Sequence, residues 1–305
     1  MKNHAFRIAF VLLFPVSIFA QPGESGMTFL TLGVSARGLA MGDAMCALAS
    51  GPAATHYNPA SLLPPDGQSS LTQILFSHKE WIQDTRSEFL GASMPLGKDQ
   101  TLGFSVNTTT VSDIEVRVRP GPSEGTFTAR DFSAGLSYAQ RIDSTISFGI
   151  SAKFLYEKIL IDEASGFAAD AGVRWQTPVE HLLVGASVTN IGSMSDLRTE
   201  STKLPTMLRI GPAYTFGAGE SQLVCAVGAD LIRVFPDKQT LVNAGGEVVF
   251  NDFVAARAGY QFGSDSRGLT LGIGILYKSL ALDYAYARVG SDLGTGHTVS
   301  LAFTL

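Results

Sequence analysis

Residues 145–154, TISFGISAKF, decide the fold because their side chains alternate between two kinds. Every second side chain from Ile146 to Phe154 is apolar, whereas those between, from Ser147 to Lys153, are small or polar. Successive side chains of a β-strand point to opposite faces, so this stretch predicts a strand with one apolar face. The same alternation recurs in 280–289, LALDYAYARV, and in 268–277, GLTLGIGILY.

The second face of these strands separates a membrane barrel from a soluble sandwich. In a soluble sheet it meets water and carries many charges, but here it is mostly Gly, Ser, Ala and Thr. Charged residues make up only 16% of the chain, against roughly 25% in a typical soluble domain. Small inward side chains suit a crowded barrel interior, with the apolar face outward against outer-membrane lipid.

The alternation predicts an all-β, transmembrane antiparallel β-barrel over 69–305. Its 14 expected strands are 69–77, 86–96, 101–111, 131–142, 145–158, 167–176, 181–191, 205–216, 221–233, 240–250, 253–263, 268–278, 279–289 and 297–305. A count of 12 stays open because the boundaries are approximate. Longer connections are expected at 119–130, 161–166, 191–204 and 290–296.

Two segments precede the expected barrel. Residues 1–20 have basic residues before a short apolar run that ends at Ala20, which is the layout of a secretory signal peptide. Residues 21–68 do not alternate and are rich in Ala, Gly and Met. A barrel of this size leaves room inside, so we expect this segment to plug the lumen or cap its periplasmic mouth. Pro59 biases Asn58 away from helix, so the Asn-Pro-Ala step turns the chain toward the first strand.

Other features exclude several kinds of function. A net charge of -5 gives no basic face for nucleic acid. Histidines show no zinc-binding spacing, and neither a catalytic triad nor a paired-carboxylate site is evident, so no enzyme activity, metal or cofactor is expected. Cys46 and Cys225 form no metal motif; either a disulfide or two free thiols fits the spacing, and the free thiols are favoured.

A few side chains have specific expected roles. Arg37 and Asp43 lie in the expected plug, where buried charges need partners, and we expect them to pair with each other or with the barrel wall. The more specific alternative is a latch that holds the plug. Aromatic residues at strand ends are expected to form the interfacial girdles of a membrane barrel. These are Trp81, Trp175, Tyr138, Tyr156 and Tyr277.

The segment SARGLAMGDAMCALASGPAATHYNPASL, residues 35–62, resembles the amino-terminal signature of the PorV/PorQ family, relatives of FadL-type outer-membrane transporters. The resemblance covers nearly the whole chain after residue 20, through 78–97, 154–172, 188–192, 204–214 and 290–301. The signature residues carried over to this chain are Arg37, Met41, Gly42, Asp43, Asn58, Pro59 and Ala60.

The resemblance implies a 14-stranded barrel in the outer membrane of a Gram-negative bacterium, with an amino-terminal plug. It also implies two hypotheses for function. In the leading one, the protein is a component or docking protein of type IX protein secretion and binds secreted proteins or secretion machinery. In the alternative, it is a FadL-like channel that takes up hydrophobic small molecules through its lumen.

Overall fold

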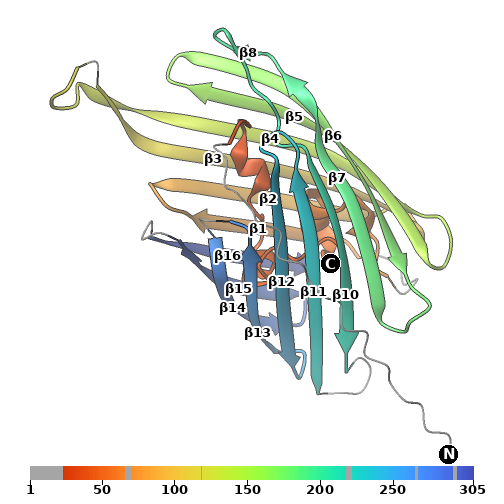
Figure 1. Ribbon diagram of the computed structural model, residues 1–305. Helices are drawn as coiled ribbons and strands as arrows, with labels where there is room; N and C mark the ends of the chain where they lie inside the picture. The colour runs from red at the N-terminus through yellow and green to blue at the C-terminus, as the bar shows by residue number, and fades with distance from the viewer. Residues whose placement is uncertain (1–22, 66–70, 118, 218–221, 265–266, 291–293) are drawn as a thin grey trace, which may run out of the picture.

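The structure is a computed structural model that describes residues 23–65, 71–117, 119–217, 222–264, 267–290 and 294–305. It is a closed antiparallel barrel of 14 strands, with the amino-terminal segment inside it (Figure 1). The expected signal peptide, residues 1–20, lies outside the described residues. No helix among the described residues is long and apolar enough to span a membrane.

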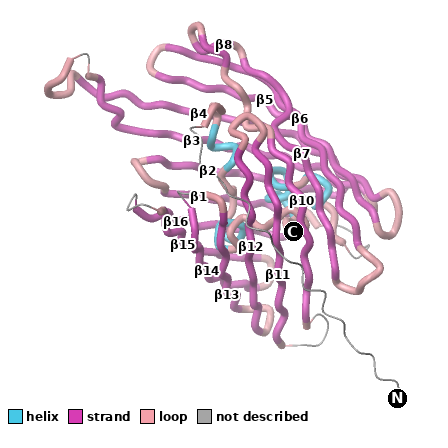
Figure 2. The backbone as a smooth tube through the Cα atoms, in the orientation of Figure 1, coloured by secondary structure: helices cyan, strands magenta, loops and turns pink. Residues whose placement is uncertain are grey.

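The barrel strands follow one another in chain order around the wall, with β1 pairing β16 to close it (Figure 2). They are β1 (Gln73–Glu80), β2 (Thr85–Pro95), β3 (Gln100–Val116), β4 (Gly125–Arg141), β5 (Ile146–Ile159), β6 (Asp162–Gln176), β7 (Leu182–Met194), β10 (Met207–Phe216), β11 (Leu223–Val234), β12 (Gln239–Phe250), β13 (Val254–Phe262), β14 (Arg267–Tyr277), β15 (Leu280–Val289) and β16 (Gly294–Thr304). A separate small hairpin, β8 (Asp196–Leu197) and β9 (Glu200–Ser201), lies between β7 and β10.

Each of the 14 expected strands overlaps one barrel strand, so the larger of the two expected counts is confirmed. The expected long connections are partly wrong. The second half of 119–130 and nearly all of 161–166 are strand, because β4 begins at Gly125 and β6 begins at Asp162. The start of β4 lacks two distinct environments. The start of β6 does alternate between buried and exposed positions, but its residues DEASG are small or charged on both faces, so the sequence shows no apolar face there.

The strands present the two faces that the alternation predicts. Ile150 and Phe154 of β5 are 52% and 40% exposed, whereas Ser147, Ser151 and Lys153 are buried. The last strand follows the same rule, with Val299, Leu301 and Phe303 on the outer face. A broad band of exposed apolar side chains therefore surrounds the barrel, as expected of a surface in contact with lipid.

The two ends of the barrel differ. We call the end where β1 begins and β16 ends the terminal rim, and the opposite end, which carries the turns after β1, β3 and β11, the loop rim. The hairpin of β3 and β4 extends far beyond the neighbouring strands at the loop rim (Figure 1). Each of its strands has 17 residues. About 10 tilted residues suffice to cross a bilayer, so the outer part of this hairpin stands clear of it.

The segment before the barrel forms short helices inside the lumen. They are η1 (Thr28–Thr31), α1 (Ala36–Ala40), η2 (Gly51–Ala53), α2 (Ala54–Tyr57) and η3 (Pro59–Leu62). We call residues 23–65 the plug. At the loop rim, Gly26 N donates to Lys203 O, and at the terminal rim Arg141 Nη2 donates to Pro64 O at 3.1 Å. The plug therefore runs through the lumen from one rim to the other.

One hydroxyl joins the plug to the seam of the barrel. Ser300 of β16 lies opposite Ser77 of β1 and donates to its hydroxyl at 2.9 Å. The same Ser300 oxygen accepts from the backbone N–H of Ala36, the first residue of α1, at 2.7 Å. First strand, last strand and plug therefore meet at one buried side chain.

Candidate functional site

The two charged residues of the plug signature are bound to the wall and not to each other. Arg37 forms an ion pair with Glu247 of β12, with Nη2 2.8 Å from Oε1. Asp43 forms an ion pair with Arg267 of β14, with Nη1 3.1 Å from Oδ2. The ion pairs therefore hold the middle of the plug against two wall strands.

The Arg37 pair belongs to a longer row of alternating charges. Glu247 also binds Arg257 of β13, and Arg257 Nη1 lies 2.6 Å from Asp283 Oδ1 of β15. The wall members of this row are buried. Losing one charge from such a row leaves its neighbours uncompensated away from water, which typically costs about 3 to 5 kcal/mol.

Met41, Gly42 and Asp43 form the tight turn that ends α1. Gly42 and Asp43 both have left-handed backbone angles, with φ of 63° and 59°. A Cβ on Gly42 would lie 2.8 Å from the backbone nitrogen of Tyr260, so only glycine fits there. The turn directs the Asp43 carboxylate toward Tyr57, whose hydroxyl donates to Oδ1 at 2.7 Å.

The Asn-Pro-Ala step clasps the plug to itself and to the wall. Asn58 is fully buried, and its Nδ2 donates to Cys46 O at 3.0 Å and to Val173 O of β6 at 3.1 Å. Its Oδ1 accepts from the N–H of Ala60 at 3.1 Å, which caps η3, and Pro59 is the first residue of that helix. This one amide therefore fixes three segments of backbone.

Wall glycines make room for the plug. At nine inward positions a Cβ would come within 3.0 Å of plug atoms, several of them backbone. These glycines are Gly91, Gly103, Gly149, Gly172, Gly185, Gly228, Gly245, Gly259 and Gly272, and we call them the glycine belt. They come from nine different strands, so the plug lies against nearly the whole inner wall.

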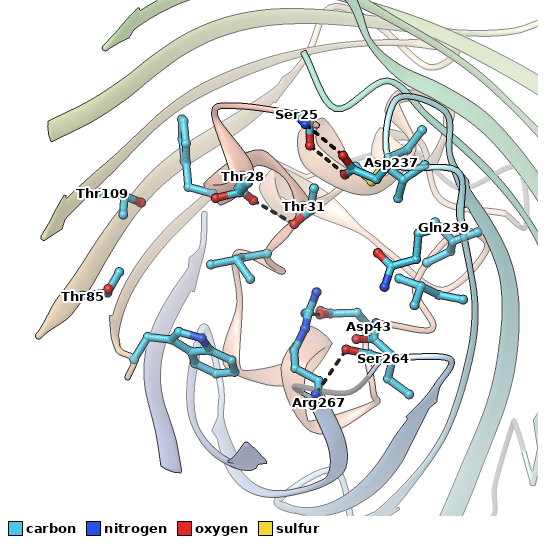
Figure 3. A pocket seen from close by; sticks show the side chains of 18 of the residues that line it. Ser25, Thr28, Thr31, Asp43, Thr85, Thr109, Asp237, Gln239, Ser264 and Arg267 are labelled. Atoms are coloured by element: carbon cyan, nitrogen blue, oxygen red, sulfur yellow. Dashed lines mark hydrogen bonds and ion pairs between the residues drawn. The ribbon is translucent and has the colours of Figure 1, made fainter. Parts of the chain in front are cut away.

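Above the plug, at the loop rim, lies a cavity of about 400 Å³ (Figure 3). The amino-terminal part of the plug forms one side, where Ser25 donates to the Asp237 carboxylate at 2.7 Å. The ion pair of Asp43 and Arg267 lies at its floor (Figure 3). The lining contains both polar and apolar side chains. The apolar ones include Phe29, Leu32, Trp81, Ile232 and Leu241. The plug separates this cavity from the terminal rim.

The cavity also contains polar atoms that lack partners. Arg209 of β10 is only 2% exposed, and its Nε and Nη1 have no hydrogen-bond partner. The centroid of the Tyr57 ring lies 5.4 Å from its guanidinium carbon, and Nη2 lies 3.8 Å from the sulfur of Met207. Asn243 Nδ2 of β12 also has no partner, although Gln261 donates to its oxygen.

Arg209 is not among the residues predicted above, yet the sequence contains a signal for it. Residue 209 falls on the inward face of its expected strand, between Met207 and Gly211, and it is the lone charge in that strand. A charged side chain at membrane depth is expensive and marks a functional position by default. Reading the inward face of each strand for charge would have identified it.

Trp81 does not belong to an interfacial girdle, which corrects the sequence expectation. It lines the cavity and packs beside the plug cluster around Leu39 and Ala40. The reason is the alternation of side chains along β1. Leu75, Ser77 and Lys79 point inward, and Trp81, two residues further on, points to the same side. Trp175 and Tyr277 are 43% and 58% exposed on the outer face, at strand ends, as expected.

The two cysteines are free. Cys46 is buried in the plug, whereas Cys225 of β11 is on the outward face of the wall, so the wall separates the two thiols. Burial and the nearby Asp230 carboxylate raise the pKa of Cys46 to about 12, so it stays protonated. In the part of the chain that the structure describes, no three His, Cys, Asp or Glu residues are grouped for a metal ion.

The fold and the site together define a class: a closed 14-stranded barrel of the outer-membrane type, with its lumen occupied by its own amino-terminal segment. No family model matches the sequence, and no curated protein matches it significantly. Many solved structures share the fold.

One of them is the toluene transporter TodX of Pseudomonas putida, with a TM-score of 0.67 at 12% identity; the match covers 89% of this chain and 98% of that one. Another is a FadL homologue from Pseudomonas aeruginosa, with a TM-score of 0.51 at 12% identity, covering 93% of this chain and 99% of that one. At such identities the likeness concerns the fold. It agrees with the 14-stranded barrel that the resemblance implies, and nothing in it bears on the PorV/PorQ family.

Proposed function

We propose that the protein is a gated outer-membrane channel for the uptake of small, largely apolar molecules. The observation that carries the proposal is the position of the cavity, which meets the loop rim and is separated from the terminal rim by the plug. A molecule would enter at the loop rim, settle in the cavity and pass only when the plug moves. The likeness in fold to TodX, a toluene transporter, supports this choice of ligand class.

The orientation and location follow from the same barrel. Outer-membrane barrels keep both ends of an even-stranded wall and their short turns on the periplasmic side. The terminal rim would then face the periplasm, and the loop rim would face outward. Cleavage near Ala20 would leave a mature chain in the outer membrane of a Gram-negative bacterium. Separation of inner and outer membranes on a density gradient tests this, and recovery in the inner membrane would contradict it.

A disulfide between plug and wall tests whether the plug is the gate. Cys46 Sγ lies 4.0 Å from the hydroxyl oxygen of Ser187 on β7, so Ser187→Cys would place two thiols together. Cys225→Ser in the same chain prevents mispairing. The assay is accumulation of radiolabelled toluene by cells that express the variant in place of other hydrocarbon channels.

We expect the reduced variant to take up toluene at the rate of the Cys225→Ser control and the oxidised variant to take up far less. Reduction should restore uptake. Equal uptake in both redox states would show that the plug does not gate passage and would overturn this mechanism.

A docking role in type IX secretion is the second candidate. The observation that favours it is the projecting hairpin of β3 and β4, which offers an exposed β-ribbon beyond the loop rim (Figure 1). The resemblance to the PorV/PorQ family implies such partners. Affinity purification from detergent-solubilised outer membrane tests it, with a chain shortened by deleting 112–128 as the matched control. Secreted proteins that copurify with the full chain and are lost on shortening would support docking.

A further inference from the structure

The outer face of the wall carries its charges at one end only. On the barrel strands below the projecting hairpin, 112–128, every described Asp, Glu, Lys or Arg side chain that points outward lies at the loop-rim end of its strand. The basic ones are Arg86, Arg130, Lys158, Arg233 and Arg288, and the acidic ones are Glu80, Glu88 and Glu163. The outward strand positions at the terminal rim include the aromatic side chains of Trp175 and Tyr277. The two rims therefore suit different surroundings on the two sides of a membrane.

Three of the basic side chains lie in one row across four neighbouring strands. Arg86 of β2 is paired in register with Thr110 of β3, which is paired with Arg130 of β4. Arg130 is paired in turn with Lys158 of β5. We call these four residues the basic row. Neighbouring strands lie about 4.8 Å apart, so Arg130 and Lys158 stand side by side with no acid between them.

The basic row has little negative charge to balance it. Lys158 forms an ion pair with Glu163 of β6, whereas the exposed Arg130 has no ion-pair or hydrogen-bond partner among the described residues. The acids next to the row in sequence, Asp131 and Glu157, point into the lumen because successive side chains of a strand alternate. Like charges that lie directly opposite on neighbouring strands are destabilising. The row is therefore suited to an anion from outside the barrel.

Apolar side chains begin directly below the basic row, on the same four strands. They are Leu90, Phe104, Leu136 and Phe154, which are between 40% and 59% exposed on the outer face. A membrane lipid has the same order of chemistry, with an anionic head group at the surface and acyl chains below it. Clusters of Lys and Arg beside the apolar surface of a membrane protein bind anionic lipid head groups, and a guanidinium binds phosphate through two parallel hydrogen bonds.

We propose that this surface binds a lipopolysaccharide molecule of the outer leaflet, with a lipid A phosphate on Arg130 and Lys158 and acyl chains over the apolar side chains below. Lipopolysaccharide occupies only the outer leaflet of an outer membrane, which agrees with the confinement of the outward charges to one rim. The proposal rests on the orientation given above, in which the loop rim faces outward. It adds a lipid partner on the outside of the wall, apart from the lumen.

Native mass spectrometry of the delipidated protein in detergent measures which lipid stays bound. The probes are bisphosphorylated lipid A and the same lipid A after removal of both phosphates. We expect one molecule of bisphosphorylated lipid A per barrel, bound about tenfold more tightly than the dephosphorylated form, because only the former can make charge-assisted hydrogen bonds to the basic row. Equal binding of the two probes would overturn the proposal.

A double variant tests whether the basic row is the site. Arg130→Gln with Lys158→Gln should weaken binding of bisphosphorylated lipid A about thirtyfold, since each basic residue near a membrane surface contributes a factor of about five. Arg233→Gln with Arg288→Gln is the matched control, because it removes two outward basic side chains at the same rim on other strands. The control should bind like the parent. Equal weakening in both double variants would reveal attraction to charge in general and would overturn the site.

Trypsin treatment of intact cells tests the orientation separately. Arg117 lies in the projecting hairpin and its side chain is 52% exposed, so trypsin should cleave there from outside. Protection in intact cells with cleavage after lysis would place the basic row at the inner leaflet, and would overturn both the orientation and lipopolysaccharide as the partner. Cleavage in intact cells, with no preference for phosphorylated lipid A, would overturn the lipid site alone and leave the channel and its orientation standing.

Discussion

Arg37 of the plug and Glu247 of β12 form a two-pronged ion pair inside the barrel, with Nη2 2.8 Å from Oε1 and Nε 3.0 Å from Oε2. The pair joins a segment before the first strand to a strand more than two hundred residues later. It is the clearest single attachment of the plug to the wall, and its loss should loosen the plug without dismantling the barrel.

Glu247→Gln should therefore release the plug. The substitution leaves Arg37 and Arg257 facing a neutral amide, at a cost of about 3 to 5 kcal/mol. We expect a lower temperature for the shift between folded and unfolded bands on unboiled gels and a higher conductance in planar bilayers. Glu115→Gln is the control, because Glu115 pairs with Arg117 on the exposed β3 hairpin. An unchanged conductance in Glu247→Gln would show that the row of charges is not a latch.

Asn58→Ala should expose the thiol of Cys46. The substitution leaves the carbonyls of Cys46 and Val173 without their donor and uncaps η3, which together destabilise the plug by about 2 to 4 kcal/mol. In a Cys225→Ser background, a water-soluble maleimide should leave the parent unlabelled at pH 7.5 and label Asn58→Ala. Rapid labelling of the parent would contradict the buried position of Cys46.

Gly149→Ala should prevent the plug from seating. The new Cβ would overlap the backbone of Pro59, which cannot move aside as a flexible side chain would. Gly246→Ala is the matched control, since its nearest neighbours there lie 3.8 Å away. Limited proteolysis, followed by mass spectrometry of the amino-terminal segment, should show cleavage within 36–60 only in Gly149→Ala. Equal protection in both variants would mean that the glycine belt is not needed for close approach.

Acidification should destabilise the plug through His56. Burial, with Arg209 and Lys153 nearby, holds the pKa of His56 well below its ordinary value of 6.5. Between the two values the unfolded chain binds a proton that the folded chain does not. The free energy of unfolding is therefore level above pH 6.5 and falls below it, by up to about 1.4 kcal/mol per pH unit.

The comparison for this effect is His56→Phe, which keeps a ring against Tyr57. Thermal unfolding of both proteins should be followed from pH 7.5 to 5.0. We expect the parent to lose more stability than His56→Phe over that range, because carboxylates elsewhere titrate in both. Parallel curves would show that His56 is not the group responsible.

The barrel could be predicted from sequence because alternation is a local signal. In a strand such as 145–154, ten residues are enough to show which side chains form the apolar face and which form the other. Strand ends are harder to predict: the start of β4 has no two-sided environment, and the start of β6 has one but carries small or charged residues on both faces. The prediction for Trp81 is wrong because an aromatic residue near a strand end joins a girdle only if it points outward, and Trp81 is in phase with the inward-facing Lys79.

The site was harder to predict because its contacts join distant segments. Arg37 and Asp43 were singled out as needing partners, but the sequence offers many candidate acids and bases and does not rank them. In the sequence, the glycines of the glycine belt look like any other small inward residues. Their role becomes clear only from their close contacts with the plug. Arg209 stands out because its buried Nε and Nη1 have no hydrogen-bond partner, and this can be seen only in the three-dimensional structure.

The hydroxyl of Ser300 has a consequence for biogenesis. It bonds to Ser77 across the seam and to Ala36 at the start of α1, so zipping the last strand to the first also completes a contact with the plug. Closure of the wall and seating of the plug therefore share one hydrogen-bonded group, and a barrel that closed with its leading segment outside would leave the buried Ser300 hydroxyl without its bond to Ala36.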